Sequence, residues 1–144
     1  MLLLRDIEAG RRFVSARRTV TEGEMMGFAG LTGDFNPVHV DEVFAREESL
    51  FGRRIVHGPM VLAMCFGMHC ERDDWKILAL LETRRRFLAP VFPGDTVHAR
   101  YEVTEVRASE SRPGTGIVTV AVSVFNDRDE AVQEGVDVLV VADR

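Results

Sequence analysis

The sequence has 144 residues, 46% hydrophobic and 28% charged, which is the size and composition of one globular domain with one core. Its 18 basic and 23 acidic residues give a net charge of -5, so no basic surface for nucleic acid is expected. No apolar run approaches the ~20 residues that cross a membrane, and the apolar residues 1–4 are too few for the core of a signal peptide. We therefore expect residues 1–144 to form a single cytoplasmic domain that binds neither nucleic acid nor membranes.

The N-terminal part predicts a strand followed by a helix. Residues 13–20 favour a first strand. Thr21 and Glu24 then have the spacing of a capping box, which starts a helix. This helix is expected to run through Leu31 and to end near Gly33, because glycine tolerates the left-handed conformation found at helix ends.

Two more helices are expected before the chain becomes extended. An irregular segment at 34–37 precedes a short helix that Asp41 can cap and that runs through residues 43–45. Further on, Pro59 fits the first turn of a helix whose residues 60–68 are almost wholly apolar. A helix that is apolar on every side is expected to be buried.

The C-terminal half predicts four strands separated by turn-forming residues, at 77–88, 96–106, 117–125 and 131–141. The second alternates apolar and polar side chains, which gives it one covered and one wetter face. A long antiparallel sheet curled around one buried helix, the α+β hot-dog fold, accommodates this order of elements. The sheet edge and the helix flank would stay exposed in one chain, so a homodimer is expected.

The segment after the first helix carries a carboxylate and an imidazole five residues apart. Asp34 and His39 flank Asn36 and Pro37, whose turn can bring the two side chains toward one point. An ionised carboxylate accepts hydrogen bonds and a histidine donates or accepts them near neutral pH. We predict that Asp34 and His39 orient a water molecule and move its proton as an acid/base pair.

The predicted buried helix begins with a glycine that can supply a hydrogen-bond donor. The amide of Gly58 is expected at the positive end of the helix, with no side chain to block a ligand. Such an amide suits a carbonyl oxygen that gains negative charge, as a thioester oxygen does when its enoyl chain is attacked at the β carbon. His57 is expected to support the site by hydrogen-bonding a local carbonyl rather than to react.

The run Gly-Asp-x-Asn-Pro-x-His at residues 33–39, followed by His57 and Gly58, resembles the hydratase signature of the MaoC-like dehydratase family. Residues 86–95 resemble the strand and turn that follow in that family, and the likeness runs from about residue 12 to the end. It implies a hot-dog dimer with sites at the subunit interface and reversible syn hydration of trans-2-enoyl thioesters to (R)-3-hydroxyacyl thioesters. It also implies no metal and no cofactor, coenzyme A being part of the substrate.

The resemblance also implies a role for single residues. The acid/base pair of the family falls on Asp34 and His39, its positioning asparagine on Asn36 and its oxyanion amide on Gly58. One departure is Pro59, which stands where the family often has an ordinary apolar residue and removes one amide from the oxyanion hole. The bulky Met64 and Phe66, on the helix expected to line an acyl tunnel, leave the acyl length open.

Several arginines are candidates for binding the phosphates of coenzyme A, because guanidinium groups match phosphate oxygens. The predicted substrate-binding residues are Asn36, His57, Arg53, Arg54 and Arg86, and Arg84 and Arg85 are further candidates. Arginines on exposed strands are also often solvated or paired with carboxylates. The sequence does not decide which of these side chains contacts a phosphate.

Cys65, His69 and Cys70 lie close enough in sequence to suggest metal ligands. No further ligand completes that cluster, and such residues on a buried apolar helix are more often core, so no metal site is expected there. Two cysteines in an apolar stretch are also no disulfide framework, which favours a reducing compartment. His98, on the wetter face of its strand, is expected to be solvated.

Three functions remain open. The leading hypothesis is a hydratase acting on an acyl-CoA rather than an acyl carrier protein; the others are a thioesterase of the same fold and a noncatalytic acyl-thioester-binding subunit. Thioesterases of this fold generally carry their carboxylate on the central helix, and no acidic residue lies between Gly58 and His69. A noncatalytic subunit would not need Asp34 and His39. The assembly is expected to be a homodimer or a hexamer built from dimers.

Overall fold

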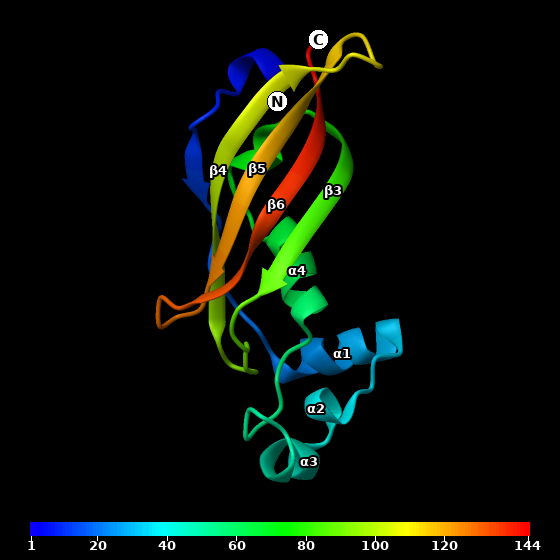
Figure 1. Cartoon of the computed structure of the whole chain (residues 1–144), viewed down its shortest axis with the longest axis vertical. Coiled ribbons are helices and arrows are strands. Elements are labelled where there is room, and N and C mark those ends of the chain that lie inside the picture. Colours follow the sequence, from blue (N-terminus) through cyan, green and yellow to red (C-terminus); the bar gives the residue numbers. More distant parts are fainter.

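The structure is a computed structural model that describes all of residues 1–144 (Figure 1). Its strands form one antiparallel sheet in the order β1-β4-β5-β6-β3, with the short β2 also paired to β4. The four predicted C-terminal strands are confirmed, as β3 (Ile77–Phe87), β4 (Thr96–Ala108), β5 (Thr115–Phe125) and β6 (Ala131–Ala142). No helix of the structure has the length and hydrophobicity needed to cross a membrane.

The helix α4 (Gly58–Gly67) lies along one face of the curled sheet (Figure 1). The alternation predicted for β4 is confirmed, because Val97, Ala99, Tyr101 and Val103 are buried while the residues between them are more exposed. These side chains form the core together with the buried face of α4. The fold is therefore the predicted α+β arrangement, in which a curved sheet packs on a central helix.

The prediction of a single strand at residues 13–20 is wrong. The structure has two short strands, β1 (Arg12–Val14) and β2 (Arg18–Thr19), which pair with different parts of β4. Ser15 interrupts the ladder, because its hydroxyl accepts the hydrogen bond of the Ala99 amide at 2.9 Å in place of a backbone carbonyl. The next amide, that of Ala16, donates to the His69 carbonyl at 2.7 Å and draws the chain away from the sheet.

The predicted capping residues act as expected. The helix α1 (Glu22–Thr32) begins at the capping box of Thr21 and Glu24 and ends at Gly33, whose φ of +76° lies in the left-handed region. Hydrogen bonds from Thr21 and Arg18 lower the pKa of the Glu24 carboxyl. The helix α3 (Glu42–Glu47) begins at Asp41, which accepts hydrogen bonds from two amides at 3.0 Å.

Buried polar side chains attach both ends of α4 to the sheet. At its first turn, the Gln133 side-chain amide donates to the Gly58 carbonyl at 2.9 Å. Near its end, the Cys65 carbonyl accepts hydrogen bonds from Tyr101 and from Arg72 of the 3₁₀ turn η2 (Glu71–Asp74), each at 3.1 Å. The bonds to Cys65 satisfy a carbonyl of the last turn that has no donor partner within the helix, and together the bonds at both ends fix α4 on the sheet.

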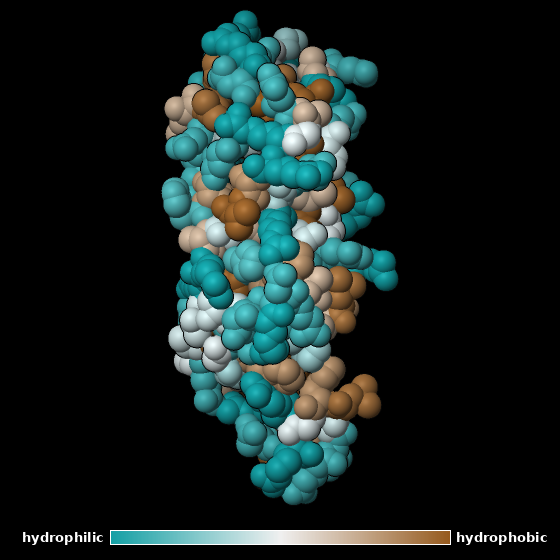
Figure 2. All heavy atoms as spheres, turned by 90° about the vertical axis from the view of Figure 1, so that its left-hand side faces the viewer, coloured by the Kyte–Doolittle hydropathy of each residue, from teal (hydrophilic) through white to brown (hydrophobic).

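One flank of the molecule remains uncovered in the single chain. The expectation that α4 is buried all round is wrong, since Pro59, Ala63 and Phe66 are exposed. Leu78 and Leu81 of the edge strand β3 are 54% and 53% exposed. The opposite side, on which β1 and β4 lie, is mainly hydrophilic with apolar groups between the polar ones (Figure 2). The predicted exposure of a sheet edge and a helix flank is thus confirmed for one chain.

Both cysteines are expected to resist thiol reagents in the folded protein. Cys65 and Cys70 are free thiols that are 1% and 4% exposed. Burial raises the pKa of Cys65 to about 11 and also raises that of Cys70, so little thiolate forms near pH 8. Ellman's reagent should detect no thiol in the native protein and two in concentrated guanidinium chloride. Rapid labelling of the native protein would contradict this packing.

Candidate active site

Asp34 and His39 lie at the end of the molecule where α1, α2 and the start of α4 meet. The His39 Nε2 atom is 3.9 Å from Asp34 Oδ2, and the two side chains are 12% and 49% exposed. The His39 Nδ1–H donates to the Ile55 carbonyl at 2.7 Å, because a carbonyl oxygen can only accept. This bond places a proton on Nδ1 and leaves Nε2 facing the carboxylate.

A short helix that was not predicted positions His39. The segment expected to be irregular at 34–37 leads into α2 (Pro37–Val40), with His39 in its single turn. Asn36 caps this helix, since its side-chain oxygen accepts the Val38 amide at 3.1 Å. The Asp34 carboxylate in turn accepts a hydrogen bond from the backbone N–H of Asn36 at 3.2 Å. The Asn36 side chain therefore bonds the backbone in this structure, at the turn between Asp34 and His39.

His57 is the fully buried residue that joins these segments. Its ring stacks on that of His39, with the two centroids 3.8 Å apart. The Phe28 ring also contacts the His57 ring, with a centroid distance of 5.1 Å. Its Nε2–H donates to the Asp34 carbonyl at 3.0 Å. The sequence suggested a histidine that bonds a local carbonyl; in the structure that carbonyl belongs to Asp34, 23 residues away.

The first turn of α4 contains one amide without an acceptor in the helix, that of Gly58. Pro59 has no N–H, and the amides of Met60 and Val61 both donate to the His57 carbonyl, at 3.0 and 3.3 Å. A Cβ at Gly58 would lie 2.6 Å from Cε1 of Phe87, so a larger residue would displace that ring. The absent side chain and the free amide leave one donor at the positive end of α4.

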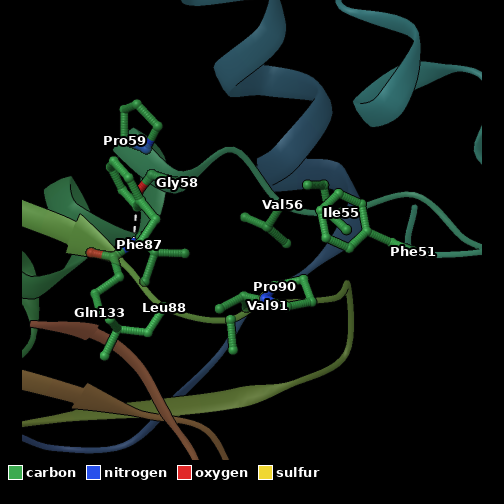
Figure 3. Close-up of a pocket in the computed structure, with 12 residues that line it drawn as sticks. Phe51, Ile55, Val56, Gly58, Pro59, Phe87, Leu88, Pro90, Val91 and Gln133 are labelled. Carbon is green, nitrogen blue, oxygen red and sulfur yellow. Dashed lines mark hydrogen bonds between the residues drawn. The ribbon is translucent and has the colours of Figure 1, made fainter. Parts of the chain in front are cut away.

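An apolar pocket of about 320 Å³ adjoins this amide (Figure 3). Gly58, Pro59 and Phe87 stand at one end and Phe51 and Ile55 at the other (Figure 3). The remaining lining residues are Val56, Val61, Leu88, Ala89, Pro90, Val91 and Gln133. Asp34 and His39 are not among them, but His39 is bonded to the carbonyl of the lining residue Ile55. Sequence reasoning missed Gln133, whose only signal was a polar residue in register with buried positions of β6.

The arginines considered for phosphate binding have different surroundings. Arg54 pairs with Glu22 and Glu42, and these hydrogen bonds raise its pKa. Arg86 contacts Glu134 at 3.4 Å, and the exposed Arg84 contacts Glu82 at 2.6 Å. Arg85, expected on an exposed strand face, is instead buried against Asp137. Arg53 lies over the Phe92 ring at 3.9 Å and has no carboxylate partner.

Asp34, His39 and His57 each offer a potential metal-binding atom, and these atoms lie within 4.8 Å of one another. The lone pairs of imidazole nitrogens lie in the ring planes, however, and the two rings are stacked with only 25° between their planes. Nearly parallel rings do not direct both lone pairs at one ion. The geometry therefore fits proton transfer better than metal binding. Of the candidates considered from the sequence, His69 is exposed and bonds Asp73, while both cysteines are buried.

The expectation that His98 is merely solvated is wrong. Its ring stacks on Phe125 with centroids 5.7 Å apart, and its Nδ1 atom is buried without a hydrogen-bond partner. Burial and the neighbouring Arg100 and Arg17 lower the pKa of His98, which favours the neutral ring. This residue lies on the outer face of β4 and does not contact Asp34 or His39.

Solved structures support the fold. A MaoC-like dehydratase from Rhodospirillum rubrum superposes with a TM-score of 0.84 and 31% identity, over 100% of this chain and 99% of that one. A Mycobacterium tuberculosis protein described as having a double hot-dog fold gives a TM-score of 0.85 over 99% of this chain and 44% of its own. Its identity is 18%, so it shows the fold alone. The chain is thus a hot-dog protein with a carboxylate and an imidazole beside the start of its central helix.

Sequence comparison identifies the family. The family model described as MaoC like domain matches residues 6–126, and the chain belongs to this family. An (R)-specific enoyl-CoA hydratase from Aeromonas caviae is 34% identical over 120 residues, which cover 83% of this chain and 84% of that protein. Protein MaoC of Klebsiella aerogenes is 35% identical over 96 residues, or 66% of this chain. The matched part is only 28% of that relative's length.

Replacing His57 should weaken the fold through its bond to Asp34. The variant His57→Phe keeps an aromatic ring but removes the N–H that satisfies the Asp34 carbonyl. We expect the free energy of unfolding to fall by about 1–2 kcal/mol, measured by urea denaturation at fixed protein concentration. The control is His69→Phe, at a side chain that is 84% exposed, with an expected change within about 0.5 kcal/mol. Equal stability of both variants would disprove the role of this bond.

Proposed function

We propose that the protein is a hydratase that reversibly adds water to a trans-2-enoyl thioester, with coenzyme A as the carrier, to give the (R)-3-hydroxyacyl thioester. The observation that carries this proposal is the geometry of Asp34 and His39. Their facing atoms are 3.9 Å apart, too far for a direct hydrogen bond but suited to holding one water between them. Relatives named (R)-specific enoyl-CoA hydratase and 3-hydroxybutyryl-CoA dehydratase support the reaction class.

In the proposed mechanism, the pair exchanges protons with the water and with the substrate on the same face of the double bond. One member accepts a proton of the water as its oxygen bonds to the β carbon, and the other delivers a proton to the α carbon. His39 takes part through Nε2, because its Nδ1–H is held by the Ile55 carbonyl. Proton transfer between the two side chains restores their starting state, so the net change is addition of one water.

The Gly58 amide is proposed to stabilise the thioester oxygen as it gains negative charge. It is the one amide of the first turn of α4 without an acceptor in the helix, and Gln133 bonds the carbonyl of the same residue, next to the Phe87 ring. The adjoining pocket is lined largely by apolar side chains and suits an acyl or pantetheine chain. No metal or redox cofactor takes part in this mechanism. We also place the protein in a reducing cytoplasm, where its free thiols persist.

We further propose that two chains pair through the edge of β3 and the open flank of α4. Leu78, Leu81 and Phe66 expose apolar surface there, and a partner would cover both this surface and the unpaired strand edge. A second copy is the occupant suggested by an isologous strand edge, which can pair with itself. A hexamer built from such dimers is the larger assembly proposed.

The proposed reaction can be tested with crotonyl-CoA. Loss of the conjugated enoyl-thioester absorbance without release of thiol is the expected result. Asp34→Asn and His39→Ala should each lower kcat/KM by about 10²–10⁴ with an unchanged circular dichroism spectrum. Dialysis against EDTA should not change the rate.

Three results would overturn the proposed reaction. Thiol release by the wild-type protein would indicate a thioesterase. Absence of turnover across several acyl lengths would indicate a noncatalytic binding subunit. Full activity of Asp34→Asn would remove the acid/base mechanism.

The proposed dimer can be tested at β3. Leu81→Arg should place a charge in the interface and shift the protein to a monomer, as measured by sedimentation equilibrium. The matched control is Leu50→Arg, at a residue that is 96% exposed and distant in sequence from β3. A monomeric wild-type protein, or a dimer that survives Leu81→Arg, would rule out this interface.

A further inference from the structure

One arginine beside the apolar pocket differs from the others in having no carboxylate partner. Arg54, Arg84, Arg85 and Arg86 each form an ion pair with an acidic side chain. Arg53 forms none; its guanidinium carbon lies 3.9 Å over the centre of the Phe92 ring, and the residue is exposed. In a chain with a net charge of -5, a cation left without an internal partner is available to an external anion.

The contact with Phe92 prepares this side chain for binding. A guanidinium group stacked flat on an aromatic ring is held by cation–π attraction and loses part of its conformational freedom. Stacking uses the face of the group, while the N–H donors point outward from its edge. These donors form the planar fork that matches two oxygens of a phosphate group.

Arg53 also stands at the end of the pocket that is remote from Gly58. Its neighbours in the chain, Phe51 and Ile55, line that end, as Figure 3 shows. Phe92 follows the lining residue Val91, whose carbonyl accepts the Val56 amide at 2.7 Å. Five peptide units separate Arg53 from Gly58, so their Cα atoms lie at most about 17 Å apart. A ligand chain that starts at the Gly58 amide and follows the pocket therefore ends near Arg53.

We propose that Arg53, stacked on Phe92, binds the phosphate at the end of the phosphopantetheine arm of a thioester whose carbonyl lies at Gly58. This inference rests on the proposed function, because it takes the Gly58 amide as the thioester site. The phosphopantetheine arm occurs in coenzyme A and on acyl carrier proteins, so the chemistry recognised is common to both. The apolar pocket holds the arm between the two polar ends.

The test compares thioesters that differ only in the phosphate of the arm and in what lies beyond it. Crotonyl esters of pantetheine, 4′-phosphopantetheine and coenzyme A are assayed with the wild type, with Arg53→Gln and with Arg84→Gln. The last variant is the matched control, because Arg84 is exposed but paired with Glu82. Loss of a charge-assisted hydrogen bond predicts that Arg53→Gln raises KM about tenfold for both phosphorylated substrates, with kcat unchanged. Its KM for the pantetheine ester should equal that of the wild type.

Several outcomes would overturn the proposal. An equal change in KM for all three esters would show that Arg53 does not recognise a phosphate. A change confined to the coenzyme A ester would assign Arg53 to a phosphate beyond the arm. An equal effect of Arg84→Gln would show a general loss of positive charge.

Activity with a crotonyl-loaded acyl carrier protein, lowered by Arg53→Gln, would identify the carrier as a second source of the same phosphate and support the proposal.

A binding measurement separates this proposal from the proposed reaction. Calorimetric titration with free coenzyme A and with 4′-phosphopantetheine requires no turnover. Weaker binding of both by Arg53→Gln, in a protein that hydrates no thioester, would support the phosphate site and reject the hydratase. Wild-type hydration with binding that Arg53→Gln leaves unchanged would reject the site and retain the hydratase. Absence of any binding by the wild type would reject the site.

Discussion

The attachment of α4 to the sheet at both of its ends is the constraint on which the rest of the structure depends. Gln133 holds the carbonyl of its first residue, and Arg72 and Tyr101 hold the Cys65 carbonyl near its last turn. These are buried bonds between polar groups, so breaking one leaves a group that water does not reach. The helix therefore cannot slide or rotate on the apolar surface beneath it, and the position of its N-terminal amide is fixed relative to the sheet.

The proposed acid/base pair, Asp34 and His39, is attached to this fixed helix through its N-cap, His57. The His57 ring stacks on the ring of His39, and its Nε2–H donates a hydrogen bond to the carbonyl of Asp34. Asp34 and His39 belong to a segment whose own helix, α2, has only four residues and contributes little stability alone. A buried aromatic contact with the start of α4 supplies the missing support. The Gly58 amide and the side chains of Asp34 and His39 are thus positioned by one residue.

The sequence predicted those elements that are determined by local interactions. Capping side chains lie within three residues of the amides they bond, as Thr21 and Asp41 do, and the alternation in β4 depends only on which face meets the core. The break at Ser15 was not predictable, because it depends on a hydrogen bond to Ala99 on another strand. Equally, β-strand alternation indicates a buried face but not which polar residue on it, such as Gln133, finds a partner across the core.

The same distinction separates the candidate site residues that could be chosen from those that could not. Spacing and residue type sufficed to select Asp34, His39 and Gly58, because all three lie within recognisable short motifs. Spacing could not separate Arg53 from its neighbour Arg54, since the two differ only in what stands opposite them. The glutamates that engage Arg54 come from α1 and α3, and the ring beneath Arg53 comes from the loop after β3.

The edge strand β3 links the pocket with the uncovered flank. Phe87, its last residue, lies against the Gly58 backbone and lines the pocket, yet the residue remains 57% exposed in the single chain. Leu78 and Leu81 lie on the same strand and are also exposed. A chain that paired with this edge would bury the outer side of Phe87 and restrict its ring against Gly58. Covering the apolar flank and completing the wall of the pocket are therefore consequences of the same contact.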